Sequence, residues 1–184
     1  MNPNRGGLQD RFEMCVKEYG DQNARDYLTL EGYLSAQKAA SDAGISTAEE
    51  LALWENENSL RSDTTLSGSS VWTPGPRQEI GPMQIRPIAA ATLGSRLPAG
   101  WNTNALANMI AAGRIYAWIL SLPEPTVPRS EAAAAYNGGT RVRGTGDNRH
   151  RRYKGIRSAT AYQKSFDQHR EMLDKVDQCM KTGR

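Results

Sequence analysis

Apolar side chains recur every three or four residues along most of this chain, and this spacing predicts a mainly α-helical protein. Five such positions indicate a first short helix: Leu8, Phe12, Cys15, Val16 and Tyr19. A second helical stretch is expected over about residues 21–43, with Gly44 as its C-terminal stop. The same spacing predicts a last helix, which runs to the end of the chain through Tyr162, Phe166, Leu173, Val176 and Met180.

A further helix is expected to begin at residue 47 and to carry an acid on its apolar face. Thr47 and Glu50 have the spacing of a capping box, in which two side chains satisfy backbone amides at a helix start. This helix places Leu51, Trp54 and Glu57 along one face. Glu57 is therefore expected to point inward among apolar neighbours.

After this helix the composition changes to Ser, Thr, Gly and Pro, over residues 62–77. No apolar period survives there, so we expect a long loop, an irregular lobe or a short β-ribbon around residues 62–80. Loops longer than about 12 residues inside a compact domain are more often functional than idle. This loop is expected to form one wall of a cleft beside Glu57.

Size and charge narrow the class of protein. A chain of 184 residues with 38% hydrophobic residues suits one compact domain, and a monomer is expected. The net charge is +3, and no apolar run approaches the roughly 18 residues that span a bilayer, so we expect a soluble protein without a membrane span. The N-terminal residues lack the basic start and apolar core of a signal peptide.

The chain has two cysteines, Cys15 and Cys179, near its opposite ends. They either form a disulfide that ties the terminal helices together in an oxidising compartment or remain buried free thiols. The two histidines, His150 and His169, lack the paired spacing of metal ligands. We therefore expect no metal site and no cofactor.

Three sequence motifs point to one acid. Glu57 lies in Trp-Glu-Asn-Glu-Asn-Ser-Leu, and downstream come Gly-Pro-Met-Gln-Ile-Arg-Pro from Gly81 and Ala-Tyr-Asn-Gly-Gly from Ala135. In this order, over roughly residues 45–165, they resemble the motifs of lysozyme-like lytic transglycosylases, in the superfamily of soluble lytic transglycosylases and goose-type lysozymes. The resemblance implies a single lysozyme-like domain over residues 1–184, with an N-terminal helical extension (1–44), a catalytic core (45–165) and a C-terminal helix (166–184).

The resemblance also implies a reaction. The β-1,4 bond between N-acetylmuramic acid and N-acetylglucosamine in peptidoglycan would be cleaved by Glu57 as general acid and then base, giving 1,6-anhydromuramoyl products. Burial beside apolar groups raises the pKa of a Glu toward the value that such an acid needs. Glu55 is a rival, but residues two apart on a helix point about 200° from each other. Glu57 has the family's spacing to Leu60, so we expect Glu57 to be the acid.

The saccharide-binding residues follow from the same resemblance. A Met offers adaptable apolar surface, and a Gln both donates and accepts hydrogen bonds. The family has Ser directly after the acid, whereas this chain has Asn there and Ser one place later. Asn108 lies five residues before Gly113 instead of the family's four and is not included. The expected set is Asn58, Ser59, Met83, Gln84, Tyr136, Asn137 and Tyr162.

A second carboxylate would change the outcome of the reaction. Hydrolytic glycosidases usually hold two carboxyl groups about 5 to 9.5 Å apart. Glu79 and Asp63 are the nearby candidates, and either would make the protein a goose-type lysozyme, a hydrolase that also uses Glu57. A non-catalytic peptidoglycan-binding or assembly component is the third interpretation. Each of these acts in the periplasm or cell wall, reached as a phage protein or as a processed secreted protein.

Basic residues concentrate between residues 141 and 157, where seven Arg or Lys accompany one acid, Asp147. An exposed solvated loop is expected, and attraction to the anionic cell wall is the alternative. Nucleic acid is not expected as a partner, because aromatic residues are limited there to Tyr153. The expected partner is the peptidoglycan glycan strand.

Overall fold

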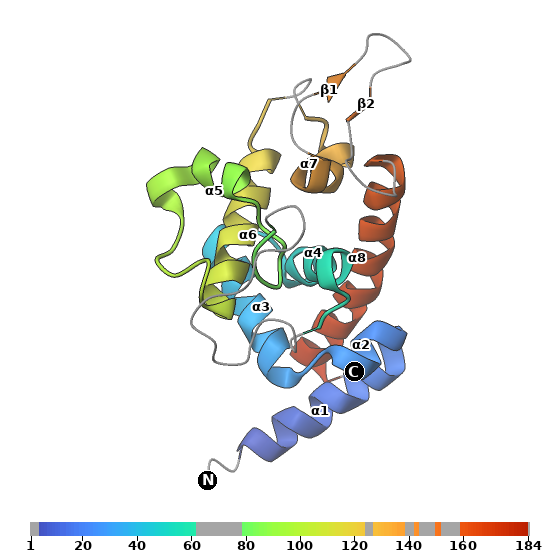
Figure 1. The fold of residues 1–184 in the computed structure, drawn as a ribbon. Helices are drawn as coiled ribbons and strands as arrows, with labels where there is room; N and C mark the ends of the chain where they lie inside the picture. The colour runs from blue at the N-terminus through green and yellow to red at the C-terminus, as the bar shows by residue number, and fades with distance from the viewer. Residues whose placement is uncertain are drawn as a thin grey trace.

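The computed structural model describes residues 4–61, 79–123, 127–138, 142–143, 150–151 and 159–183. Over these ranges the chain is mainly α-helical, which confirms the predicted class (Figure 1). Its helices are α1 (Asn4–Tyr19), α2 (Gln22–Tyr27), α3 (Leu30–Ala43), α4 (Thr47–Asn58), α5 (Pro87–Leu93), η1 (Gly94–Arg96), α6 (Ala105–Leu120), η2 (Arg129–Glu131), α7 (Ala132–Gly138) and α8 (Ala159–Thr182). None of the helices described in these ranges is long and apolar enough to cross a membrane.

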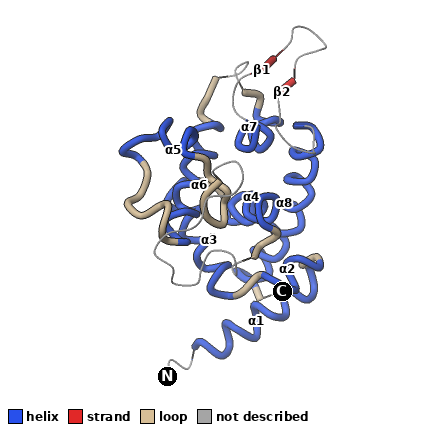
Figure 2. The backbone as a smooth tube through the Cα atoms, viewed as in Figure 1, coloured by secondary structure: helices blue, strands red, loops and turns tan. Residues whose placement is uncertain are grey.

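Helix α4 is central, and α3, α6 and α8 pack around it (Figure 2). Its residues from Leu51 to Trp54 are fully buried, so the middle of the helix is enclosed on every side. Gly32 of α3 permits a close approach here, because a Cβ at that position would lie 2.9 Å from the Trp54 ring. Burial of each large apolar side chain contributes about 1.5 to 3 kcal/mol, and together they fix the helix that carries Glu57.

The helix predicted over residues 21–43 is in fact two helices, so that prediction is wrong. Asp21 caps α2 and accepts the Ala24 N–H at 2.9 Å, while Thr29 caps α3 and accepts the Gly32 N–H at 3.1 Å. Each cap satisfies an amide at a helix start, which favours beginning a new helix at each of these polar residues. Gly44, at φ 72°, ends α3 as predicted.

The capping box of α4 lies one residue earlier than predicted. The Ser46 hydroxyl accepts the Glu49 N–H at 3.1 Å, and the Glu49 carboxylate accepts the Ser46 N–H at 2.8 Å. Thr47 and Glu50, the predicted pair, are both buried. The two pairs are equivalent as sequence patterns, and the rotation of α4 about its axis decides which pair faces solvent.

A disulfide joins Cys15 of α1 to Cys179 of α8, with the two Cα atoms 5.7 Å apart. Both cysteines are buried in the core. Nearby, the Tyr33 hydroxyl of α3 donates a hydrogen bond of 2.7 Å to Asp177 of α8. Of the two alternatives for the cysteines, the structure has the disulfide, and it fastens the N-terminal helix to the C-terminal one.

The segment predicted as a loop, lobe or β-ribbon lies mostly outside the described residues, at 62–78. Its described end forms an antiparallel bridge between Ile80 and Ile85. In the basic segment, β1 (Val142–Arg143) and β2 (His150–Arg151) pair antiparallel. The prediction of a loop is therefore wrong for these four residues, and the rest of that segment up to residue 157 lies outside the described residues.

Candidate active site

Glu57 lies in the last turn of α4, directly before the helix ends. Ser59 and Leu60 follow with φ angles of 53° and 59°, in the left-handed region. Residues other than glycine rarely adopt this conformation, and each costs about 1 to 3 kcal/mol. Leu60 is fully buried, so packing in the core compensates for this turn. The acid thus stands at a helix end whose backbone is held by the core.

Two side chains from distant segments donate hydrogen bonds to the Glu57 carboxylate. Asn137 Nδ2 of α7 lies 2.9 Å from Oε1, and the Tyr162 hydroxyl of α8 lies 2.5 Å from the same oxygen. Asn56 Nδ2 also donates to the Tyr162 carbonyl at 3.2 Å, which ties α4 to α8 at this level. The structure therefore brings together three motif residues that are far apart in the sequence.

The surroundings of Glu57 favour the protonated acid. Burial is the largest effect and raises the pKa of Glu57 to about 7. The hydrogen bonds from Tyr162 and Asn137 lower this pKa, because they stabilise the carboxylate form. The charge of Glu79 raises this pKa, and the charge of Arg86, a smaller effect, lowers it. A carboxyl with this pKa can both give and take a proton near neutral pH.

A cleft of about 620 Å³, including the open space at its mouth, lies in front of Glu57. It is lined by Glu57, Glu79, Gln84, Ile85, Arg86, Ala89, Ile115, Tyr136 and Asn137. Three of the expected binding residues, Gln84, Tyr136 and Asn137, thus share the cleft with the expected acid.

The other expected binding residues do not line this cleft: Asn58, Ser59, Met83 and Tyr162. Met83 is fully buried, and its carbonyl accepts a hydrogen bond of 2.9 Å from the Tyr136 hydroxyl. Asn58 Nδ2 donates to the Arg61 carbonyl at 3.2 Å. Tyr162 is 2% exposed and reaches Glu57 from within the core. Met83 and Tyr162 therefore lie behind the residues that line the cleft and hold Tyr136 and Glu57 in place.

The sequence did not predict the part that Asn108 plays. This buried residue of α6 accepts the Met83 N–H at 3.0 Å and donates to the carbonyls of Ile80 and Trp101 at 3.2 and 3.0 Å. Gly81 lies against it, at φ 74°, and a Cβ there would come within 2.5 Å of the amide. The sequence offered it only as a near match to the family's Asn, which was set aside because it lies five residues before Gly113 instead of four. Asn108 holds the turn that presents Gln84 to the cleft.

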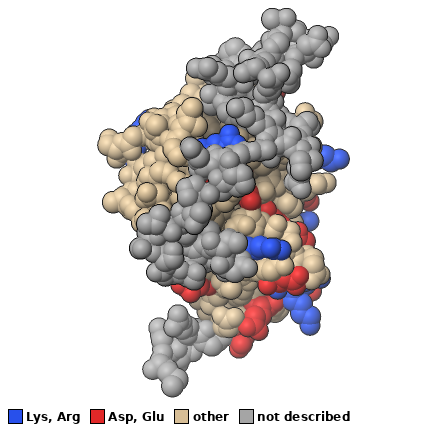
Figure 3. Space-filling view, in the orientation of Figure 1, with Lys and Arg blue, Asp and Glu red and all other residues tan. Residues whose placement is uncertain are grey.

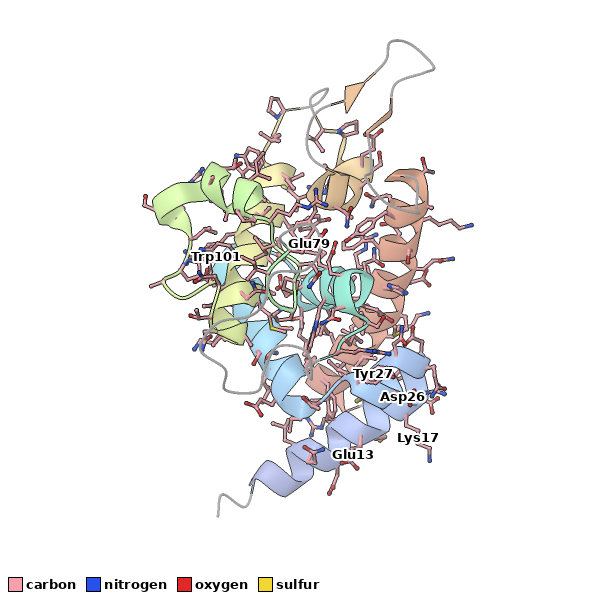
Figure 4. All side chains as sticks on the ribbon, viewed as in Figure 1. Glu13, Lys17, Asp26, Tyr27, Glu79 and Trp101 are labelled. Carbon is pink, nitrogen blue, oxygen red and sulfur yellow. A yellow bond between two sulfur atoms is a disulfide. The ribbon has the colours of Figure 1, made fainter. Side chains whose placement is uncertain are left out.

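Of the two candidates for a second carboxylate, Glu79 lies in the cleft and Asp63 lies outside the described residues. Figure 4 shows Glu79 between α4 and α7 in that view. Arg86, which the sequence did not single out, donates from its guanidinium to Glu79 Oε1 at 3.1 Å. The cleft therefore holds one ion pair beside the Glu57 carboxyl.

Glu55 faces a different group of side chains from Glu57. It is 3% exposed and lies beside Asp21 and His169. Burial, and then the neighbouring Asp21, raises the pKa of Glu55 to about 8. Ligand atoms of these three residues all lie within 4.8 Å of one another, so they form a group that can hold a metal ion. The histidine spacing gave no indication of this group, because its members come from three separate elements.

Comparisons of the chain with protein-family models, curated proteins and solved structures give no match. The chemistry of the cleft is accordingly inferred from its own residues. These are a carboxyl with a pKa of about 7, two neutral donors that hold it, and an ion pair beside it.

Proposed function

We propose that this protein is a peptidoglycan lytic transglycosylase built on a lysozyme-like domain. Its substrate is the β-1,4 bond between N-acetylmuramic acid and N-acetylglucosamine. The observation that carries the proposal is the pair of hydrogen bonds from Asn137 and Tyr162 to Glu57. These three residues belong to the motifs that resemble those of the family, and they meet at a cleft that also contains Gln84.

In the first step, protonated Glu57 gives its proton to the glycosidic oxygen, and the bond from that oxygen to the muramic acid C1 breaks. The N-acetylglucosamine end leaves as an alcohol, and positive charge develops at C1. In the second step, the 6-hydroxyl of the same muramic acid attacks C1 and gives its proton to the Glu57 carboxylate. The product is a 1,6-anhydro sugar, no water is consumed, and Glu57 regains its proton.

The hydrogen bonds at Glu57 support this double role. Both donors bind Oε1, so they fix the plane of the carboxyl and leave Oε2 to carry the transferred proton. Burial keeps the acid form available near neutral pH. Neither donor is charged, so neither holds the carboxylate as strongly as a cation would.

A hydrolase of the goose-type lysozyme class is the second candidate, because Glu79 lines the same cleft. In that mechanism Glu79 activates a water or stabilises the charge at C1. The ion pair with Arg86 favours transglycosylation, because the guanidinium already occupies Glu79 Oε1, at 3.1 Å, and competes for that oxygen with a water that Glu79 would have to hold.

The disulfide supports a place of action outside a reducing cytosol. Disulfides persist mainly in oxidising compartments such as the periplasm or the extracellular space. The Cys15–Cys179 bridge is therefore consistent with work in the periplasm or at the cell wall, where the proposed substrate lies.

Release of soluble fragments from purified peptidoglycan tests the proposal. Glu57→Gln should lower the rate by at least about 100-fold, because it removes the proton donor while keeping the shape of the side chain. Glu31→Gln, at an exposed position on α3, is the matched control and should retain the wild-type rate. A Glu57→Gln protein with wild-type activity would contradict the assignment of the acid. No release by the wild-type protein would favour the non-catalytic binding component.

A further inference from the structure

A second group of chemically active side chains lies on α4, apart from the cleft. It consists of Asp21 at the start of α2, Glu55 in α4 and His169 in α8, and it will be called the Asp-Glu-His cluster. Glu55 is two residues before Glu57, so on a helix the two side chains point about 200° apart. None of the three residues lines the cleft. The proposed function therefore assigns no role to this cluster.

Glu55 is the member that carries the argument, because it is buried and has few hydrogen bonds. Only 3% of it is exposed, and no N–H or O–H group of the described residues donates to its Oε2, apart from a proton shared with the Asp21 carboxyl, which raises the pKa of Glu55. Its Oε1 has a long contact of 3.5 Å from Asn23 Nδ2, and His169 Nε2 lies 3.7 Å away from it. A buried carboxylate with few hydrogen bonds is costly, and it points to a ligand that satisfies it.

The geometry of the cluster fits a small cation. Ligand atoms of all three residues lie within 4.8 Å of one another. Two ligand atoms on a tetrahedral zinc ion lie about 3.4 Å apart, close to the 3.7 Å between His169 Nε2 and Glu55 Oε1. Asp21 is held in place by its bond with the Ala24 N–H. Small rotations of the side chains would complete the contacts.

We propose that the Asp-Glu-His cluster binds a divalent transition-metal ion, with Zn²⁺ as the best fit. One imidazole and two carboxylates suit zinc, whereas Mg²⁺ and Ca²⁺ prefer ligand sets made of oxygen alone. A water completes the coordination, since Asp21 and His169 are partly exposed. The ion joins the start of α2, the middle of the molecule at α4, and α8. It therefore stabilises the helix that carries Glu57 without touching the cleft.

The surface near this cluster carries charges of both signs. Figure 3 shows Asp and Glu side chains, with Lys and Arg side chains among them, over the end of the molecule formed by α1 and α2. Glu13 and Asp26, both exposed, belong to these two helices and are labelled in Figure 4.

Zinc binding to the full chain, freed of metal with a chelator, tests the proposal without any measurement of activity. Calorimetric titration should give one Zn²⁺ per chain, and saturating zinc should raise Tm by about 5 °C or more. Mg²⁺ should leave Tm unchanged. Glu55→Gln and His169→Gln should each weaken zinc binding at least about tenfold, which matches the loss of one ligand. Glu171→Gln, an exposed change on α8, is the control and should bind like the wild type.

Circular dichroism of each variant establishes that it is folded before binding is compared. Co²⁺ in place of zinc gives a visible absorption band that reports nitrogen and oxygen ligands, so loss of this band in His169→Gln supports ligation by the imidazole. Absence of one-to-one zinc binding by the wild type would overturn the proposal. The carboxyls of Asp21 and Glu55 would then share a proton instead of a metal ion. Equal zinc affinity in Glu55→Gln and the wild type would likewise overturn it.

Discussion

The Tyr162 hydroxyl lies 2.5 Å from Glu57 Oε1, although the two residues are 105 positions apart in the chain. Tyr162 is 2% exposed, and both burial and the charge of Glu57 raise its pKa well above 10. The hydroxyl therefore stays protonated and can only donate to the carboxylate. This contact ties the helix of the acid to the C-terminal helix and fixes the orientation of the carboxyl.

Replacing Tyr162 with Phe should lower kcat by about tenfold or more and leave KM nearly unchanged. The variant keeps the ring in the core but removes the donor that orients Glu57. Rates of fragment release from peptidoglycan at several substrate concentrations measure both constants. Tyr19→Phe, on the exposed side of α1, is the control with the same atomic change and should match the wild type. An unchanged kcat in Tyr162→Phe would mean that the contact has no part in the reaction.

Asn108→Ala should destabilise the protein by about 3 kcal/mol or more. It removes three hydrogen bonds and leaves the Met83 N–H and two carbonyls without this partner, at about 1 to 3 kcal/mol each. Urea unfolding followed by circular dichroism gives the free energy. Asn102→Ala, at an exposed position, should change it by less than about 0.5 kcal/mol. Equal stability of the two variants would show that the turn before Gln84 does not depend on Asn108.

Glu50 makes stability depend on pH. Its two carboxyl oxygens are buried and have no hydrogen-bond partner within the described part of the chain, and burial raises its pKa well above 4.5. The unfolded chain ionises Glu50 as pH rises through about 4.5 while the folded chain does not, so the contribution to stability is full below that pH and declines above it. Each pH unit in this range costs up to about 1.4 kcal/mol.

Glu50→Gln should therefore gain stability relative to the wild type as pH is raised from 5 to 8, because the amide does not titrate. Urea unfolding of both proteins at the two pH values measures the difference. The exposed Glu31→Gln change should track the wild type at both values. A constant difference between Glu50→Gln and the wild type across this range would contradict the burial of an uncharged Glu50.

Loss of the disulfide should lower stability by about 3 to 5 kcal/mol. The bridge spans 164 positions, so it strongly restricts the unfolded chain. Unfolding of the wild type with and without a reductant, beside the double variant Cys15→Ser and Cys179→Ser, measures the effect. The reductant should not change the double variant. If reduction leaves the wild type as stable as before, the two thiols are not bonded in solution.

Helix ends that depend on local sequence could be predicted, whereas those that depend on packing between helices could not. Gly44 ends α3 in a left-handed conformation that glycine adopts easily, so its effect could be predicted. The break at Thr29 was missed because Ala, Leu, Gln and Lys on either side favour helix. The capping box was placed one residue late, because only the packing of α4 decides that Ser46 faces solvent while Glu50 is buried.

The residues of the candidate site were likewise predicted only in part. The motif residues Glu57, Gln84 and Asn137 do line one cleft, which a family pattern can anticipate. The pairing of Arg86 with Glu79 was not anticipated. Asn108 was set aside because of its spacing to Gly113, although it holds a turn of the site from a neighbouring helix. Contacts of this kind depend on how distant segments meet in space, and a single sequence does not carry that information directly.

The mass of the soluble products from purified peptidoglycan tests the central claim most directly. The account predicts muropeptides that are lighter than their hydrolysed counterparts by one water, released by the wild type and by Glu79→Gln but absent with Glu57→Gln. Products that carry a reducing end, lost in Glu79→Gln as well as in Glu57→Gln, would contradict it and identify a hydrolase that uses both carboxylates.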